Sequence, residues 1–380
     1  MKKYLHILAL LCIFVSCGKD KSSSVDRMAM SFAVITPEVH TKAEVTSTSL
    51  DNVYIYGQMS SGNESEPVFD SPGIAKLIYS DSTKLWSPGK YSYGGTWNTG
   101  EYTWDTEAKM YYQFYAHAYS SNADVGTDLI IPGNLYGRQF TVTQPESAEW
   151  TAPDEVDGES DGSGTIDYLL SYLVNVPPAE HYPLVTLNLE HAMAKVEVDV
   201  RIANAMYMKD EDKVITGCLV KDICVELNGI RRRAEMLCLQ PKLDGESGSN
   251  TWYISHDESV STATYKVRDI DRSALNLSGA ENGITTDMSF LAVPVKNNEM
   301  SDYRLVLTYN NLGSADDKSP ADYEYVFNLA DYSPQGWVSG HRVKYVLTID
   351  NSIHLTGTIL DYDEVDYIEA TLLPDIPVTY

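Results

Sequence analysis

The chain has 380 residues, enough for about two to three domains that each bury a core, so a peptide hormone or a disulfide-stapled miniprotein is excluded. Its formal net charge of -26, from 28 Lys and Arg against 54 Asp and Glu, disfavours contact with phosphates, and no nucleic-acid partner is expected. An apolar content of 43% is too high for a disordered chain, and 27 Tyr beside 7 Phe suit half-exposed strands.

Residues 1–16 have the pattern of an export signal. After a basic start, residues 5–15 form an apolar stretch that is too short to span a bilayer. A small residue, Ser16, then precedes Cys17, as in the lipobox of bacterial lipoproteins. We expect cleavage before Cys17 and attachment of a lipid such as palmitate to its thiol. The alternative is an ordinary secretory signal with an incidental cysteine.

Three further cysteines belong to the expected mature chain: Cys218, Cys224 and Cys238. If Cys17 carries a lipid, at most one disulfide can form among them. Their spacing lacks the Cys-x-x-Cys pairs of a zinc site, and their neighbours are Val, Ile and Leu. We therefore expect buried thiols, and whether any disulfide forms is left open.

Alternation of apolar and polar residues predicts strands along most of the chain. They cover residues 29–35, 51–56, 110–119, 185–202, 223–227, 303–309, 323–329, 343–349 and 353–360. In the first of them, Phe32 and Val34 share one face, and the residue after each shares the other. Polar turns between short strands are typical of β-sandwiches, so the fold class is all-β. Only residues 166–174 are expected to form a short helix.

The strand pattern of residues 185–202 changes parity. Apolar side chains occupy odd positions as far as Met193 and even positions from Val196, which predicts a bulge or turn near residues 194–195. His191 falls on the apolar parity. We therefore expect a packed, hydrogen-bonded histidine there, and neither a metal ligand nor a base.

A proline-bounded acidic stretch, residues 145–183, marks a domain boundary. The predicted division is a signal peptide at 1–16, a tether and first strand at 17–42, an N-terminal β-sandwich at 43–182, a C-terminal β-sandwich at 183–361 and an appendix at 362–380.

Motifs for chemistry are sparse. Residues 158–162, Gly-Glu-Ser-Asp-Gly, match the string of a nucleophile elbow, but no buried strand precedes them. Asp157, Glu159 and Asp161 have the spacing that opens a calcium loop, although Tyr168 stands where its closing glutamate belongs. They are a calcium candidate, against the simpler interpretation of a solvated acidic loop. No zinc-protease, phosphate-loop or dinucleotide motif occurs, so we expect no enzyme, no cofactor and no other metal site.

Aromatic residues support a competing function. Tryptophan rings can stack on sugars, although aromatic residues in strands usually belong to a core. The alternative is therefore a monomeric surface lipoprotein that binds glycan through exposed aromatics, and a surface hydrolase that uses the acidic loop ranks last. The candidates are Trp86, Trp97, Trp104, Trp150, Trp252 and Trp337. The one basic run, residues 231–233, is expected at a solvated hairpin end.

Five groups of segments together resemble the fimbrillin family, the lipoprotein precursors of the pili of Bacteroides-type bacteria. They are the lipobox that ends at Cys17; MAMSFAVI at 28–35 with TKA at 41–43 and LDNVYIY at 50–56; YTW at 102–104 with YQFYA at 112–116; IDYLL at 166–170 with LNLEHAMAKV at 187–196; and WVSGHRVKY at 337–345. They follow one another in the family's order over nearly the whole chain.

The resemblance implies two transthyretin-like, Greek-key β-sandwich domains in tandem and a polymer made by strand exchange between subunits. The implied partners are other copies of the chain or homologous pilin subunits, with a host or bacterial surface ligand in an adhesion or biofilm role. The implied location is the outer membrane, through the lipid on Cys17 before maturation, and then the fimbrium at the cell surface. Neither a cofactor nor a catalytic residue comes with the family. Whether the subunit is a stalk, tip or anchor is left open.

The resemblance also suggests where the chain is processed and which strand it donates. Lys42 stands at the maturation site, where the family's known members have arginine; Arg27 is the alternative, but a cut there would leave the first strand attached. The candidate donor strand is the appendix, whose β-favouring residues include Val365, Tyr367, Ile368, Leu372 and Leu373. The alternative for the appendix is an edge strand of its own domain.

Overall fold

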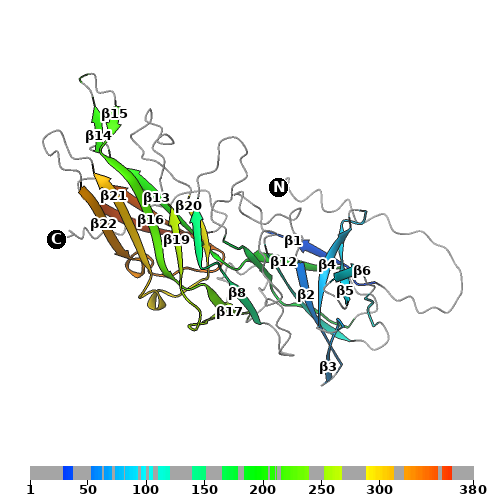
Figure 1. The fold of residues 1–380 in the computed structure, drawn as a ribbon. Coiled ribbons are helices and arrows are strands. Elements are labelled where there is room, and N and C mark those ends of the chain that lie inside the picture. The colour runs from blue at the N-terminus through cyan, green and yellow to red at the C-terminus, as the bar shows by residue number, and fades with distance from the viewer. Residues whose placement is uncertain are drawn as a thin grey trace, which may run out of the picture.

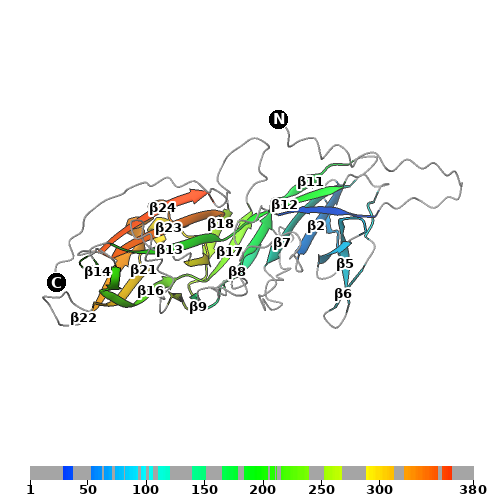
Figure 2. The same cartoon turned by 90° about the horizontal axis from the view of Figure 1, so that it is seen from above.

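The computed structural model describes residues 29–36, 53–61, 64–70, 73–80, 82–92, 96–99, 102–105, 110–119, 139–150, 165–178, 184–203, 206–209, 211, 215–238, 252–267, 288–311, 321–349 and 353–361. In these ranges the regular elements are β-strands and two short 3-10 helices (Figures 1 and 2), so the all-β prediction is confirmed. None of the described helices has the length and apolar content needed to cross a membrane.

The first sheet closes on itself. It contains β1 (Phe32–Ile35), β2 (Val53–Ser61), β3 (Glu64–Pro67), β4 (Ile74–Ser80), β5 (Leu85–Ser92), β6 (Thr96–Thr99), β7 (Tyr111–Tyr119), β10 (Tyr168–Ser171), β11 (Val174–Val176) and β12 (Val185–His191). Its ladders run from β7 through β10, β12, β1, β5, β4 and β2 and back to β7. Buried side chains from these strands form one apolar core, with Phe114 of β7 fully buried in it.

The remaining strands form four sheets. One has the order β20 (Met288–Ala292), β13 (Ala194–Ile202), β23 (His341–Ile349), β24 (Ile353–Asp361). A second has the order β22 (Ala321–Asn328), β21 (Arg304–Asn311), β16 (Val220–Ile230), β19 (Ala263–Val267), β9 (Ser147–Trp150). These two share an apolar core, as the layers of a β-sandwich do. The smaller sheets are β18 (Trp252–His256), β17 (Arg233–Cys238), β8 (Gln139–Thr143) and the pair β14 (Tyr207–Lys209), β15 (Ile215–Cys218); the 3-10 helices are η6 (Asn297–Glu299) and η7 (Leu329–Tyr332).

The predicted strands are confirmed, whereas the predicted helix at 166–174 is wrong. That segment forms β10 and β11. All four residues of β10 are buried, because the strand lies in the ladder between β7 and β12. A strand that is buried on both faces does not alternate between apolar and polar residues. The spacing of apolar residues in such a short run therefore cannot distinguish the strand from a helix.

The predicted break within residues 185–202 is confirmed. The chain leaves β12 in the first sheet, passes through Ala192 and Met193, and enters β13 in another sheet. The change of parity therefore marks a change of sheet.

Strand pairing crosses residue 182, where the sequence predicts a domain boundary. β12 lies after that residue and pairs with β10 and β1 of the first sheet. β8 and β9 lie before it and pair with β17 and β19. Prolines and acidic residues mark where a loop runs, and they do not determine which sheet the next strand joins. The division into two transthyretin-like domains stays a prediction.

A third apolar cluster connects the first sheet to the later strands. It contains Tyr168 and Leu170 of β10 together with Met236 of β17 and Leu291 of β20. Partly buried tyrosines of β2 and β7 pack against it, and they come from the outer face of the first sheet. The two halves of the molecule are therefore joined by packed side chains as well as by the chain itself.

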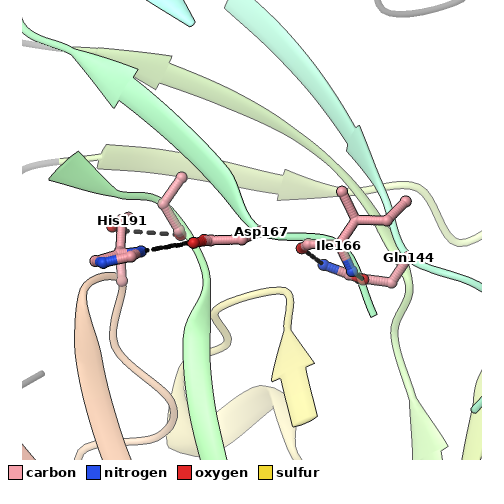
Figure 3. A network of polar contacts seen from close by, with 6 residues as sticks. Gln144, Ile166, Asp167 and His191 are labelled. Atoms are coloured by element: carbon pink, nitrogen blue, oxygen red, sulfur yellow. Dashed lines mark hydrogen bonds and ion pairs between the residues drawn. The ribbon is translucent and has the colours of Figure 1, made fainter. Parts of the chain in front are cut away.

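Buried polar contacts accompany this cluster (Figure 3). The Nδ1 atom of His191, at the end of β12, lies 3.0 Å from Oδ2 of Asp167, and both side chains are buried. Gln144 donates to the carbonyl of Ile166 at 2.6 Å and accepts from its amide at 2.8 Å. The hydroxyl of Ser339 donates to the carbonyl of Ala192 at 2.9 Å. The prediction of a packed, hydrogen-bonded His191 is confirmed.

His117 of β7 makes the stability of the fold sensitive to acid. Its ring is stacked on Tyr54 with centroids 5.3 Å apart, and burial lowers its pKa from 6.5 to about 3. The unfolded chain binds this proton below pH 6.5 and the folded chain only near pH 3, so the free energy of unfolding decreases as the pH falls through this interval, by up to about 1.4 kcal/mol per pH unit.

We expect His117→Phe, which keeps a flat ring in the stack, to weaken this acid dependence. Urea unfolding of both proteins between about pH 4 and pH 7 measures it. An equally steep decrease of the unfolding free energy in the variant would contradict this role of His117.

Candidate functional site

β1 is the segment on which the closure of the first sheet depends (Figures 1 and 2). It pairs in parallel with β12, from Phe32 opposite Val185 to Ile35 opposite Asn188, and its Phe32 is opposite Trp86 of the antiparallel β5. Among the described strands, β1 is the only one that connects β12 to β5. Removing it would break the ladder and expose an edge on each neighbour.

The side chains of β1 alternate between the core and the surface. Phe32 is 0% exposed and meets Phe114 edge to face, with ring centroids 5.3 Å apart. Met30 is 3% exposed, and Val34 is packed against the same core, whereas Ile35 is 52% exposed. The predicted parity of this strand is confirmed.

The backbone of the β1 segment bonds to both sides. The amide of Met30 donates to the carbonyl of Tyr102 at 2.7 Å, and the amide of Val185 donates to the carbonyl of Ser31 at 3.4 Å. We use the term β1 groove for the space that residues 29–35 fill between β12 and β5, above Phe114. Residues 30, 32 and 34 occupy one row of core-facing positions in the groove. The backbones of β12 and β5 border the groove on either side and offer hydrogen-bonding groups to a strand.

Most residues of the sequence-predicted site lie outside the described residues, and their roles stay predictions. They are the lipidation residue Cys17, the processing residues Lys42 and Arg27, the calcium candidates Asp157, Glu159 and Asp161, the residues 158–162, and the donor residues Val365, Tyr367, Ile368, Leu372 and Leu373. Cys224 lies half-buried in β16, while Cys218 and Cys238 lie in β15 and β17. In the parts of the chain that the structure describes, no three His, Cys, Asp or Glu side chains are grouped for a metal ion.

The tryptophans whose side chains the structure describes belong to the cores. Trp86, Trp104 and Trp337 are 6%, 3% and 1% exposed. Trp337 is further held by a hydrogen bond from its Nε1 to the hydroxyl of Tyr345, at 2.8 Å. These three rings are therefore not available as platforms for a sugar.

The arginine run 231–233 differs from the solvated hairpin end that the sequence predicts. Arg231 and Arg232 connect β16 to β17, Arg233 begins β17, and all three residues are half-buried. The two strands belong to different sheets. Arg232 donates to the carbonyls of Ser261 and Gln144, at 3.1 and 3.3 Å. Arg231 forms an ion pair with Glu299 at 3.8 Å. The run is half-buried because the chain changes sheets at this point.

Comparisons with known proteins gave matches only among solved structures. No family model and no curated protein matches the chain. A cell adhesion protein from Bacteroides ovatus, so described provisionally, is 13% identical, with 90% of this chain and 99% of that chain covered and a TM-score of 0.46. A fimbrial protein from Bacteroides vulgatus is 14% identical, with 87% and 99% covered and a TM-score of 0.44. A fimbrial assembly protein from Parabacteroides distasonis is 11% identical, with 88% and 100% covered and a TM-score of 0.35.

Because the identities and TM-scores are low, the function proposed below is taken from this chain's own strands.

Proposed function

We propose that the chain is a structural subunit of a surface pilus, exported as a lipoprotein and polymerised by donor-strand exchange after proteolysis removes its N-terminal strand. A strand of a neighbouring subunit then fills the β1 groove. The proposal assigns the chain no catalytic activity and no cofactor.

The position of β1 carries this proposal. β1 is the first of the described strands, and the stretch between it and β2 contains Lys42, so a cut there separates β1 from the strands that follow. Withdrawal leaves the edges of β12 and β5 unpaired and uncovers the buried positions of Met30 and Phe32. An extended segment from another subunit satisfies both deficits at once, through backbone hydrogen bonds and alternate apolar side chains.

The proposed lipid on Cys17 implies an order for these events. Before the cut, the lipid on Cys17 would hold the chain at the outer membrane while β1 is still attached, and the cut after Lys42 would separate the lipid and β1 from the subunit in one step. The same cut therefore releases the subunit from the membrane and makes it competent for assembly. The alternative, glycan binding through exposed aromatics, gains no support from Trp86, Trp104 and Trp337, because all three are buried.

The N-terminal residue of assembled protein tests the proposed processing. We expect mass spectrometry of subunits recovered from polymers to give Ala43 as the first residue. Lys42→Gln should abolish polymers, whereas Arg27→Gln, the matched control on the other side of β1, should leave them unchanged. Recovery of intact lipidated Cys17 from polymerised subunits would contradict this route.

A further inference from the structure

A buried contact between an amine and a carboxyl group joins two adjacent parallel strands, β13 and β23. The Nζ atom of Lys344 lies 2.6 Å from Oδ2 of Asp199. Val198 and Tyr345, which are opposite each other in the register, belong to the apolar core, so Lys344 and Asp199 lie on the other face of the sheet. Both are nevertheless almost wholly buried, at 6% and 1% exposed. Two strands therefore hold the two groups together away from water.

The buried pair has two possible chemical states. As an ion pair, each charge loses its hydration, and the mutual attraction offsets this cost only where further hydrogen bonds satisfy both groups. As an amide, formed by condensation of the amine with the carboxyl group, the pair carries no charge, and burial of a neutral polar group costs far less. The contact also places the amine nitrogen beside the carboxyl carbon, as a near-attack geometry requires. Burial therefore favours the amide, and exclusion of water protects it from hydrolysis.

A second carboxylate stands beside the pair. Glu197 is directly opposite Lys344 in the register of β13 and β23, and it lies two residues before Asp199 on the same face. Its Oε1 atom lies 3.7 Å from Nη1 of Arg342 and 3.6 Å from Nζ of Lys195, and these two cations hold it in place. A carboxylate at this position can accept a proton from the amine and pass it to a leaving hydroxyl group.

We propose that Lys344 and Asp199 condense to an intramolecular isopeptide bond that links β23 covalently to β13. A proton first passes from the ammonium group to the carboxylate of Asp199, which leaves a neutral amine beside a carboxylic acid. The lone pair of Nζ then forms a bond to Cγ, and Glu197 takes one proton from the nitrogen. Glu197 returns this proton to the hydroxyl group of the tetrahedral intermediate, the bond from Cγ to that oxygen breaks, and water leaves. One amine and one acid thus give one amide and one water, without an oxidant, a reductant or a cofactor.

The chain offers a matched control for the role of burial. The Nζ atom of Lys266 in β19 lies 2.5 Å from Oε1 of Glu226 in the neighbouring β16, a contact of similar length. Their side chains are 31% and 27% exposed, so both charges keep part of their hydration. We expect this pair to remain an ion pair.

Mass spectrometry of the folded full chain, unfolded in denaturant and digested with trypsin, tests the proposal. We expect residues 196–201 to be joined to the peptide that contains Lys344, at a mass lower than the sum of the two by one water molecule. Lys266 and Glu226 should give no linked peptide. Lys344→Arg keeps the positive charge but cannot form this bond, so its digest should contain no linked peptide. Glu197→Gln should lower the linked fraction about tenfold or more at equal times after expression.

Each result bears on one part of the proposal. A digest of the unaltered chain that contains only separate peptides would overturn the bond and leave a buried ion pair, and this result needs neither variant to fold. Equal linkage of Lys266 to Glu226 would overturn the role of burial, and a linked peptide in Lys344→Arg would overturn the assignment to that side chain. An unchanged linked fraction in Glu197→Gln, with thermal melts that verify its fold, would overturn the role of Glu197.

Discussion

A chain that begins at Ala43 is expected to melt at a temperature more than about 10 °C below that of the full chain. Full burial of Phe32 and Met30 stabilises the fold by about 1.5–3 kcal/mol each, and each ladder hydrogen bond of the strand adds about 1 kcal/mol. The sum is comparable to a typical margin of about 5–15 kcal/mol for a folded domain. At about 2–4 °C per kcal/mol for a domain of about 150–250 residues, the shift is large.

Two controls separate the strand from the rest of the N-terminus. A chain that begins at Met28 keeps β1 and should melt like the full chain. A synthetic peptide of residues 28–36, added to the chain that begins at Ala43, should restore part of the lost stability, because it binds the folded state only. Superimposable melts of the chains that begin at Met28 and at Ala43 would show that β1 is peripheral to the fold.

Deletion of residues 365–380 is expected to abolish polymers and to leave the melting temperature of the monomer unchanged. A donor strand contributes its apolar side chains to another subunit, so its loss costs the parent subunit nothing. Detergent-resistant ladders on a gel report the polymer, and thermal unfolding of the unprocessed monomer reports the fold. β24 already pairs along its whole length with β23, so the described sheet does not depend on the deleted residues for that ladder.

A replacement of the same length provides the control for this deletion. A tail of alternating Ser and Thr at positions 365–380 keeps the chain length and removes the apolar residues, and it should also fail to polymerise. Unchanged polymers after the deletion would contradict the donor role. A monomer that melts at a lower temperature after the deletion would instead identify the tail as an edge strand of its own domain.

The sequence was sufficient to predict strands that have one buried and one exposed face. β2 and β21 alternate in burial along most of their length, and their alternation of residue types is visible in the sequence. The sequence of β10 is compatible with a helix because both faces of the strand are buried, so its residues do not alternate. The parity of β1 and the break after His191 are predictable for the same reason as β2. In each case one side of the strand is covered, so apolar residues recur at every second position.

The neighbours of each strand could not be predicted in the same way. The parallel pairing of β1 with β12 joins residues 32–35 to residues 185–188, and no local pattern encodes a partner so far along the chain. The pairing of β8 with β17 and of β9 with β19, across the predicted boundary, is equally non-local. The sequence also does not identify the aromatic outer face around Tyr54 and His117 as a packing surface, since aromatic residues on a strand are compatible with either a covered or an exposed face.

The parallel alignment of β1 with β12 has a mechanical consequence. In a fibre held by a strand at this position, tension along the strand loads its hydrogen bonds together, in shear, and they cannot open one at a time from one end. The same geometry recurs downstream: β12 continues through Ala192 and Met193 into β13, which is aligned in parallel with β23 from Lys195 opposite Arg342 to Ile202 opposite Ile349. Load entering at the groove would therefore pass lengthwise from β12 into β13, which is held between β20 and β23 in its own sheet.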